Sequence, residues 1–241
     1  MARPGQPRLP FLVQIPLSTP RVNGIVNAEG EVDLRQRKLA VARLPRNLKA
    51  QELDTLYAFL RIHPSREKQV GRMALHSLKN DVLDRLIEQE VVPEDLGARM
   101  TDMFRDTGQE PLWRDYLAQH FAEFYRARWA PGRTIEHDPE RQAFRQMILE
   151  ALDETDSPIA GSTLLGLERL TETGSYPEFE PGMLGDLALK MAEKERASDG
   201  ARTVAVQVAA RMGKVEILEP AREWARNGSS IPLRMAAIGA L

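Results

Sequence analysis

The sequence contains no cysteine in its 241 residues. Structural disulfides, thiolate metal sites and a cysteine nucleophile are therefore excluded. The absence leaves the compartment open, because cytosolic proteins and exported helical proteins can both lack cysteine. We expect either a cytoplasmic protein or one that has been exported and has lost a signal peptide.

Long apolar runs are also missing. No run approaches the roughly 18 to 20 apolar residues that a helix needs to span a bilayer. The sequence therefore predicts a soluble protein without a membrane segment. Near the N-terminus the one apolar run is Pro10–Leu17, which Pro16 interrupts, and this makes a poor signal peptide.

Neither sign of charge prevails, because 33 lysines and arginines face 35 aspartates and glutamates for a net charge of −2. A protein that binds nucleic acid or an anionic membrane over its whole surface carries a clear basic excess. The balance argues against nucleic acid as a partner, although a local basic groove is compatible with it.

Motifs of known chemistry are absent from the sequence. Its four histidines lack the spacing of a metal site, and it has neither a glycine-rich phosphate loop nor a Gly-x-Ser-x-Gly nucleophile elbow. Carboxylates such as Glu150 and Glu154 lie among basic residues at predicted helix ends, where a solvated face explains them better than acid–base catalysis. We therefore expect no enzyme activity, no catalytic residues, no metal and no cofactor.

The first 35 residues contain five prolines and show no helical periodicity. We interpret residues 1–35 as an irregular arm or linker, with a small hairpin over Ile25–Val32 as the alternative. Helical periodicity follows over the rest of the chain, 36–241, which predicts one helical repeat domain. Its clearest helix starts are Asp138-Pro139 and Ser157-Pro158, because each joins a capping residue to a first-turn proline.

The final stretch, 199–241, repeats itself. An aliphatic residue followed by arginine begins each copy, at Ala201-Arg202 and Leu233-Arg234, and small or aliphatic residues recur at the same offsets afterwards. Such self-similarity is typical of helix pairs that bury their apolar faces on neighbouring repeats. We count about five antiparallel helix pairs, the last of them incomplete.

These residues resemble the HEAT-repeat family, strongly over 199–241 and weakly over 94–198. The resemblance implies an all-α fold, a right-handed α-solenoid whose inner helices line a concave binding surface. The family's basic residue near the start of the inner helix is present as Arg114, Arg202 and Arg234, but Ala160 or Gly161 takes its place in the middle copy. Tetratricopeptide and armadillo solenoids share the periodicity, and we favour HEAT.

Two groups of residues are candidate binding sites. The concave-face candidates are Arg114, Gln119, Arg202, Gln207 and Arg234. For the arginines, we favour the alternative that they make contacts within the array. The second group is a basic segment formed by Arg126, Arg128, Trp129 and Arg133. It has the composition to hold a phosphate or stack on a base, but we favour a basic helix end followed by a packed tryptophan.

Three functions remain in competition. The first is a non-enzymatic scaffold that binds an unknown protein partner on the concave face. The second is a nucleic-acid binder or base-modifying enzyme similar to the HEAT-like glycosylases, which requires a basic concave stripe, aromatic residues and a buried carboxylate. The third is a protein that self-associates through its terminal repeats, with a monomer as the alternative state.

Overall fold

The structure is a computed structural model that describes residues 20–26, 34–63, 69–132, 135–172 and 176–241. Within these ranges the chain forms α-helices and short 3-10 turns, and it has no strand. The all-α prediction is confirmed, and successive helices pack as expected for a helical repeat. The right-handed sense of the solenoid stays a prediction, and the predicted features of Pro10–Leu17 lie outside the described residues.

The chain divides into two compact units, Met1–Arg85 and Leu86–Leu241. The division falls inside helix α4, whereas the sequence predicts a single repeat domain from residue 36 onwards. The described helices of the first unit are α1 (Pro20–Val26), α2 (Leu34–Ala42), α3 (Ala50–Leu60) and most of α4 (Gln69–Ile87).

The prediction of an irregular arm over residues 1–35 is wrong at Pro20–Val26, because these residues form helix α1. Val22 and Ile25 are fully buried, and α1 packs on α2 and α3. The helix therefore gains its stability from tertiary contacts, since a seven-residue segment is too short to be stable alone. The alternative hairpin is also wrong at Ile25 and Val26, and its remaining residues lie outside the described ranges.

Eight α-helices make up the described part of the second unit. They are α5 (Leu96–Arg105), α6 (Pro111–Arg128), α7 (Pro139–Asp153), α8 (Pro158–Thr171), α9 (Pro181–Glu193), α10 (Asp199–Arg211), α11 (Leu218–Asn227) and α12 (Ile231–Ala240), with 3-10 turns η1 (Ile135–His137) and η2 (Val215–Ile217). Consecutive helices pair as α5 with α6, α7 with α8, α9 with α10 and α11 with α12.

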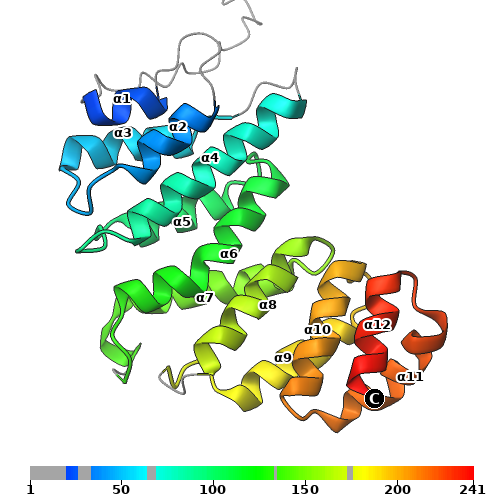
Figure 1. Ribbon diagram of the computed structural model, residues 1–241. Helices are drawn as coiled ribbons and strands as arrows, with labels where there is room; N and C mark the ends of the chain where they lie inside the picture. The colour runs from blue at the N-terminus through cyan, green and yellow to red at the C-terminus, as the bar shows by residue number, and fades with distance from the viewer. Residues whose placement is uncertain (1–19, 27–33, 64–68, 133–134, 173–175) are drawn as a thin grey trace, which may run out of the picture. The chain divides into compact units, whose positions relative to one another are not determined.

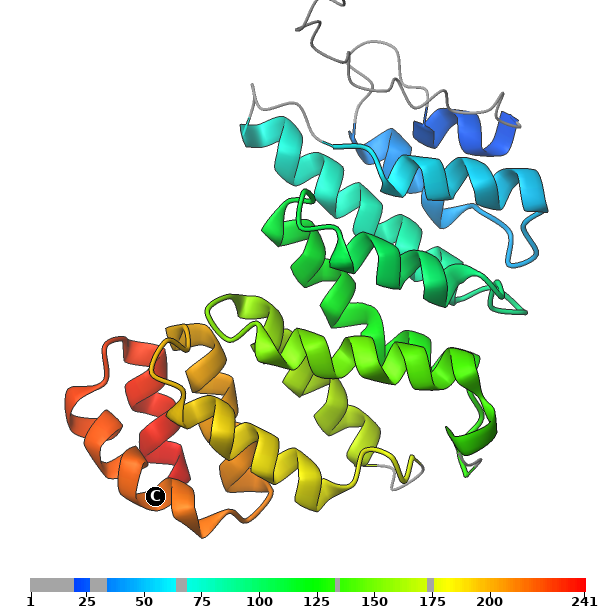
Figure 2. The same ribbon diagram turned by 180° about the vertical axis from the view of Figure 1, so that it is seen from behind.

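One layer of the second unit consists of α6, α8, α10 and α12, which we call the inner-layer helices. Each contacts the next, and Figures 1 and 2 show them following one another in chain order. Small residues bring these helices close together. A Cβ added to Gly166 of α8 would lie 3.2 Å from the Cβ of Ala122 in α6, so a larger side chain would push the two helices apart.

Serine residues begin three of the inner-layer helices. Ser157, Ser198 and Ser230 are the N-caps of α8, α10 and α12, and the side chain of each accepts a hydrogen bond from a backbone N–H of the first turn. Such a cap contributes about 1 kcal/mol to helix stability. The repeated cap also sets a common register, because residues equally far from the three serines occupy equivalent positions.

Candidate functional site

The three arginines of the repeat pattern bind backbone carbonyls at the end of the preceding helix. The pairs are Arg114 with Phe104 (2.6 Å), Arg202 with Ala192 (3.0 Å) and Arg234 with Gly228 (2.8 Å). The last carbonyls of a helix have no partner within it, and a cation there also meets the negative end of the helix dipole. Each arginine therefore fastens the two helices of a pair, which is the contact within the array that we favour from the sequence.

Two of these guanidinium groups make additional contacts. Arg114 forms an ion pair with Glu154, and Arg202 donates a second hydrogen bond to the Lys194 carbonyl at 2.8 Å. The ring of Trp224 also lies 5.7 Å from the Arg202 guanidinium carbon. These arginines are therefore structural residues of the array, although we name them as binding candidates from the sequence.

The break in the arginine pattern falls at a position where α8 packs against α10. Gly161 occupies in α8 the position of Arg202 in α10, four residues after the capping serine. A Cβ on Gly161 would lie 3.4 Å from the Ala201 Cα and 3.5 Å from a methyl group of Val204. A Cβ would thus make ordinary van der Waals contacts with α10, and this position of α8 packs directly against α10 where the other copies have an arginine.

Gln119 belongs to a small polar cluster between α6 and α8. Its amide donates to one oxygen of Asp115 at 2.9 Å, and Ser162 donates to the other oxygen at 2.7 Å. Asp115 is buried, so these two bonds satisfy a carboxylate that has left water. Gln207, the other glutamine named from the sequence, lies exposed on α10.

Exposed charges of both signs follow the inner-layer helices. We define the inner-layer face by Glu123 and Arg126 of α6, Arg169 of α8, and Gln207 and Arg211 of α10, all of them exposed. A hydrogen bond with His120 lowers the pKa of the Glu123 carboxyl; burial opposes this effect, while the charges of Arg126 and Arg169 reinforce it.

Arg211 connects this face to the buried part of α8. Its guanidinium makes two parallel hydrogen bonds to the carboxylate of Glu168, at 2.5 and 2.6 Å. The bond to Glu168 is also the main reason why the pKa of Arg211 lies above its usual value. The inner-layer face therefore carries three arginines and one glutamate. Glu123 lies close to Arg126 and Arg169 and interrupts the basic side chains, so they do not form a continuous stripe.

The basic segment around Trp129 does not form an exposed platform. Trp129 is 6% exposed, and its ring centroid lies 4.8 Å from that of Tyr125 and 5.5 Å from that of Phe124. Arg128 makes an ion pair with Glu140 at 2.7 Å, whereas Arg126 is exposed on the inner-layer face. Arg133 lies outside the described residues. A buried indole cannot stack on a base, so the structure agrees with the packed tryptophan that we favour.

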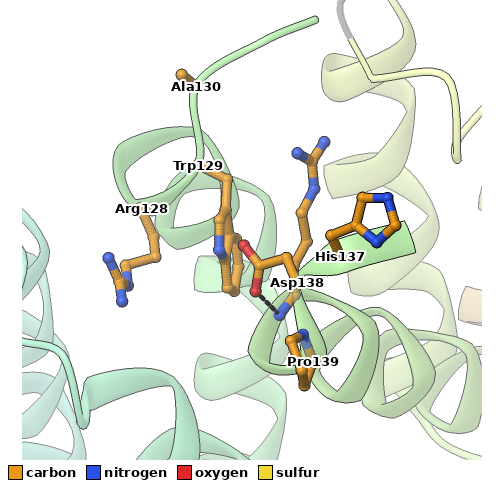
Figure 3. A pocket seen from close by; sticks show the side chains of 7 residues that line it. Arg128, Trp129, Ala130, His137, Asp138 and Pro139 are labelled. Carbon is orange, nitrogen blue, oxygen red and sulfur yellow. Dashed lines mark hydrogen bonds between the residues drawn. The ribbon is translucent and has the colours of Figure 1, made fainter. Parts of the chain in front are cut away.

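A cavity of about 400 Å³ lies beside this tryptophan, between the end of α6 and the start of α7. Figure 3 shows the side chain of Arg128 directed away from His137, with Trp129 and Asp138 between them. Asp138 caps α7, because its carboxylate accepts a hydrogen bond from the Arg141 backbone N–H at 2.9 Å. The lining residues are Arg128, Trp129, Ala130, His137, Asp138, Pro139 and Arg141.

Arg141, which lines this cavity, belongs to a buried ion pair that sequence reasoning missed. Arg141 and Glu178 lie 2.6 Å apart with side chains that are 1% and 4% exposed. Arg141 Nε also donates to the Tyr125 hydroxyl at 2.9 Å, and that hydroxyl donates to Glu178. The signal was present in the sequence: Arg141 precedes Phe144 and Met147 at helical spacing, which places it on the buried face of α7.

Tyrosine ionisation is suppressed in this cluster. Burial is the first cause that raises the pKa of Tyr125, and the hydrogen bond to Glu178 is the second. Burial alone would lower the pKa of Arg141, but the bonds with Tyr125 and Glu178 outweigh it and the net shift is upward. The guanidinium therefore stays charged and the phenol stays neutral, so the cluster acts as a permanent clamp between α6, α7 and the loop before α9.

Helix α12 exposes an apolar face. Its exposed apolar residues are Ile231 (68%), Met235 (62%) and Ile238 (55%), and the exposed Leu241 (58%) directly follows the helix. The opposite face, with Leu233 and Ala237, is buried against the array. A helix that is apolar on every side normally lies inside a protein or an interface. The composition of residues 231–241, with Arg234 as the single charge, carried that signal.

Comparison with known proteins gives this chain no relative: no family model, no curated protein and no solved structure matches it significantly. Among the described residues, no helix has both the length and the apolar composition needed to cross a bilayer. The function must therefore be argued from the surfaces above.

Proposed function

We propose that the second unit is a non-enzymatic scaffold of HEAT-like design that binds a protein segment along its inner-layer face. The observation that carries the proposal is the run of exposed polar and charged side chains across α6, α8 and α10, in which Glu123 lies beside Arg126 and Arg169. Three consecutive helices present these groups from one layer, so an extended or helical segment can contact several repeats at once. Paired charges of opposite sign favour specific recognition of a protein.

The same observation disfavours the nucleic-acid alternative. A phosphate backbone is neutralised by lysines and arginines in a continuous strip, but here Glu123 lies close to Arg126 and Arg169. The aromatic residue of the basic segment, Trp129, is buried and does not line an open groove. We therefore propose a protein partner, whose contacting surface also carries both signs.

A charge-reversal experiment tests this proposal. The wild-type chain, the variant Arg126→Glu/Arg169→Glu and the control Lys190→Glu/Arg196→Glu are each used to capture proteins from an extract of the source cells. The control makes the same change of charge at two exposed positions in α9 and the loop after it. We expect to find a protein that the wild type and the control capture equally. The inner-layer variant should bind this protein about tenfold more weakly, which corresponds to about 1.4 kcal/mol of binding free energy.

Purified partner and chain are then compared by calorimetry, and circular dichroism checks that both variants keep their helix content. Equal capture by all three chains would contradict the proposal. A fluorescein-labelled DNA duplex of random sequence is measured in parallel at physiological salt. Binding of this duplex that only the inner-layer variant loses would favour the nucleic-acid alternative.

A further inference from the structure

The exposed face of α12 occupies a position that is covered elsewhere in the array. Eight residues after the capping serines Ser198 and Ser230 lie Val206 in α10 and Ile238 in α12. Val206 is fully buried, whereas Ile238 is 55% exposed. In the register of the repeat, the face of α12 is therefore equivalent to a face that a further pair of helices would cover.

We propose that this face binds the same face of a second copy of the chain, with the two α12 helices antiparallel across a two-fold axis. Such an interface is self-complementary, because each copy supplies the same patch. Ile231, Met235 and Ile238 are spaced by four and three residues, so they form one stripe along the helix. This inference does not depend on the proposed function, since it uses α11 and α12 and not the inner-layer face.

The charges of the neighbouring helix α11 support a second copy as the occupant. Helix α11 packs directly on α12 and exposes Glu219 and Glu223 together with Arg222 and Arg226. Its first exposed charge is acidic and its last is basic. When two such helices run antiparallel, Glu219 of one copy faces Arg226 of the other, and Glu223 faces Arg222. The flank is therefore complementary to itself in charge.

A glycine on α12 allows the two helices to approach closely. A Cβ added to Gly239 would have no atom within 4 Å, so this position opens towards solvent. Glycine in an exposed helix costs about 1 kcal/mol of stability relative to alanine, and close contact with another backbone is a physical reason to keep it. Gly239 directly follows Ile238, which belongs to the stripe.

The size of the surface sets the strength of the association. A ten-residue helix is about 15 Å long, so α12 alone offers less than the roughly 800 Å² per partner of a standard interface. The contact needs both α11 and α12 from each copy, and it stays at the lower end of the size range. We therefore expect a reversible dimer with a Kd on the order of 10 μM.

Sedimentation velocity of the full chain between about 1 and 300 μM, a range that brackets this Kd, tests the proposal. We expect the mean mass to rise from that of a monomer towards twice that value. The variant Met235→Glu/Ile238→Glu should stay monomeric throughout, because four carboxylates would meet without partners in the interface. The control Met73→Glu replaces a similarly exposed methionine in α4, outside α11 and α12, and should dimerise as the wild type does.

The antiparallel arrangement has its own test. Glu219→Arg and Arg226→Glu should each weaken the dimer several-fold by placing like charges together, and the double variant should recover the wild-type Kd. A monomer over the whole concentration range, a dimer that survives Met235→Glu/Ile238→Glu, or a double variant that does not recover would each overturn the proposal. Equal thermal melting of all variants as monomers verifies that the substitutions leave the fold intact.

Discussion

Arg141 and Glu178 lie 2.6 Å apart, although 36 residues separate them in the chain and both side chains are almost completely buried. A buried charge without a counter-charge is strongly unfavourable, whereas a well-packed apolar pair of similar volume often replaces an ion pair at little cost. Each residue therefore matters for stability mainly because the other is present, and neither contributes much stability on its own.

We predict from this pair a large coupling energy in a double-mutant cycle. Arg141→Met and Glu178→Leu should each lower the free energy of unfolding by about 3 to 5 kcal/mol, because each leaves one charge buried. In the double variant, the free energy of unfolding should fall by clearly less than the sum of the two single decreases. Urea denaturation followed by circular dichroism measures all four chains, and additive losses would show that the pair is not a coupled unit.

The raised pKa of Tyr125 predicts that the stability of the fold changes at alkaline pH. The folded chain holds the phenolic proton more tightly than the unfolded chain, in which the pKa is 10.0. The stability that this proton provides is fully present below pH 10 and is lost as the pH rises above it, with a slope of at most about 1.4 kcal/mol per pH unit. The difference in stability between the wild type and Tyr125→Phe should therefore narrow above pH 10.

Urea titrations at pH 8, 9, 10 and 11 check this behaviour, with Tyr116→Phe as the control. Tyr116 lies half-buried on the same helix, outside the cluster around Arg141. Tyrosinate absorbance near 295 nm should also appear later for Tyr125 than for an unfolded tyrosine. A difference between the wild type and Tyr125→Phe that stays constant from pH 8 to pH 11 would contradict the assignment.

Replacement of Arg202 measures how much stability the arginine of the repeat gives to a helix pair. Arg202→Ala removes hydrogen bonds to the carbonyls of Ala192 and Lys194, and it should cost about 1 to 3 kcal/mol. The control Arg222→Ala removes an arginine whose partner, Glu219, is 83% exposed, and it should change stability by less than about 0.5 kcal/mol. Thermal unfolding of both variants measures the difference, and equal effects would argue against the role of Arg202.

The helix starts and the role of the arginines follow from local rules, and the sequence predicts them well. Asp138 and Ser157 cap their helices as predicted, because a cap depends only on residues within one turn. Arg202 reaches a carbonyl only ten residues away, at the end of the preceding helix. These features need no knowledge of how distant parts of the chain meet.

The features that sequence reasoning missed depend on distant contacts. Pairing of Arg141 with Glu178 requires α7 to meet the loop before α9, and no local pattern fixes that meeting. Helix α1 is similar, since its buried residues Val22 and Ile25 are too few to reveal a helix without the neighbours they pack on. The exposed face of α12 differs, because its apolar composition was visible and only the absence of a cover needed the structure.

The surroundings of Gly228 predict that this position, in the turn between α11 and α12, tolerates no side chain. A Cβ there would lie 2.6 Å from the Trp224 carbonyl oxygen, which accepts the N–H of the same glycine, and 3.1 Å from Arg234 Cγ. Gly228→Ala should therefore cost about 1 to 3 kcal/mol, because the backbone must shift and disturb the bond from Arg234 to the Gly228 carbonyl. The matched control is Gly182→Ala in the first turn of α9, where a Cβ meets nothing within 4 Å.

That control should be neutral or stabilise the protein by up to about 1 kcal/mol, since alanine is the better helix former. Urea denaturation of both variants gives the comparison, and hydrogen exchange of the α12 amides locates the effect. Exchange in Gly228→Ala should accelerate in α11 and α12 before it does in α6 and α8, because the contacts of Gly228 are with residues of α11 and α12. Faster exchange spread evenly over all four helices would show that the unit opens as a whole, and it would contradict a local role for this turn.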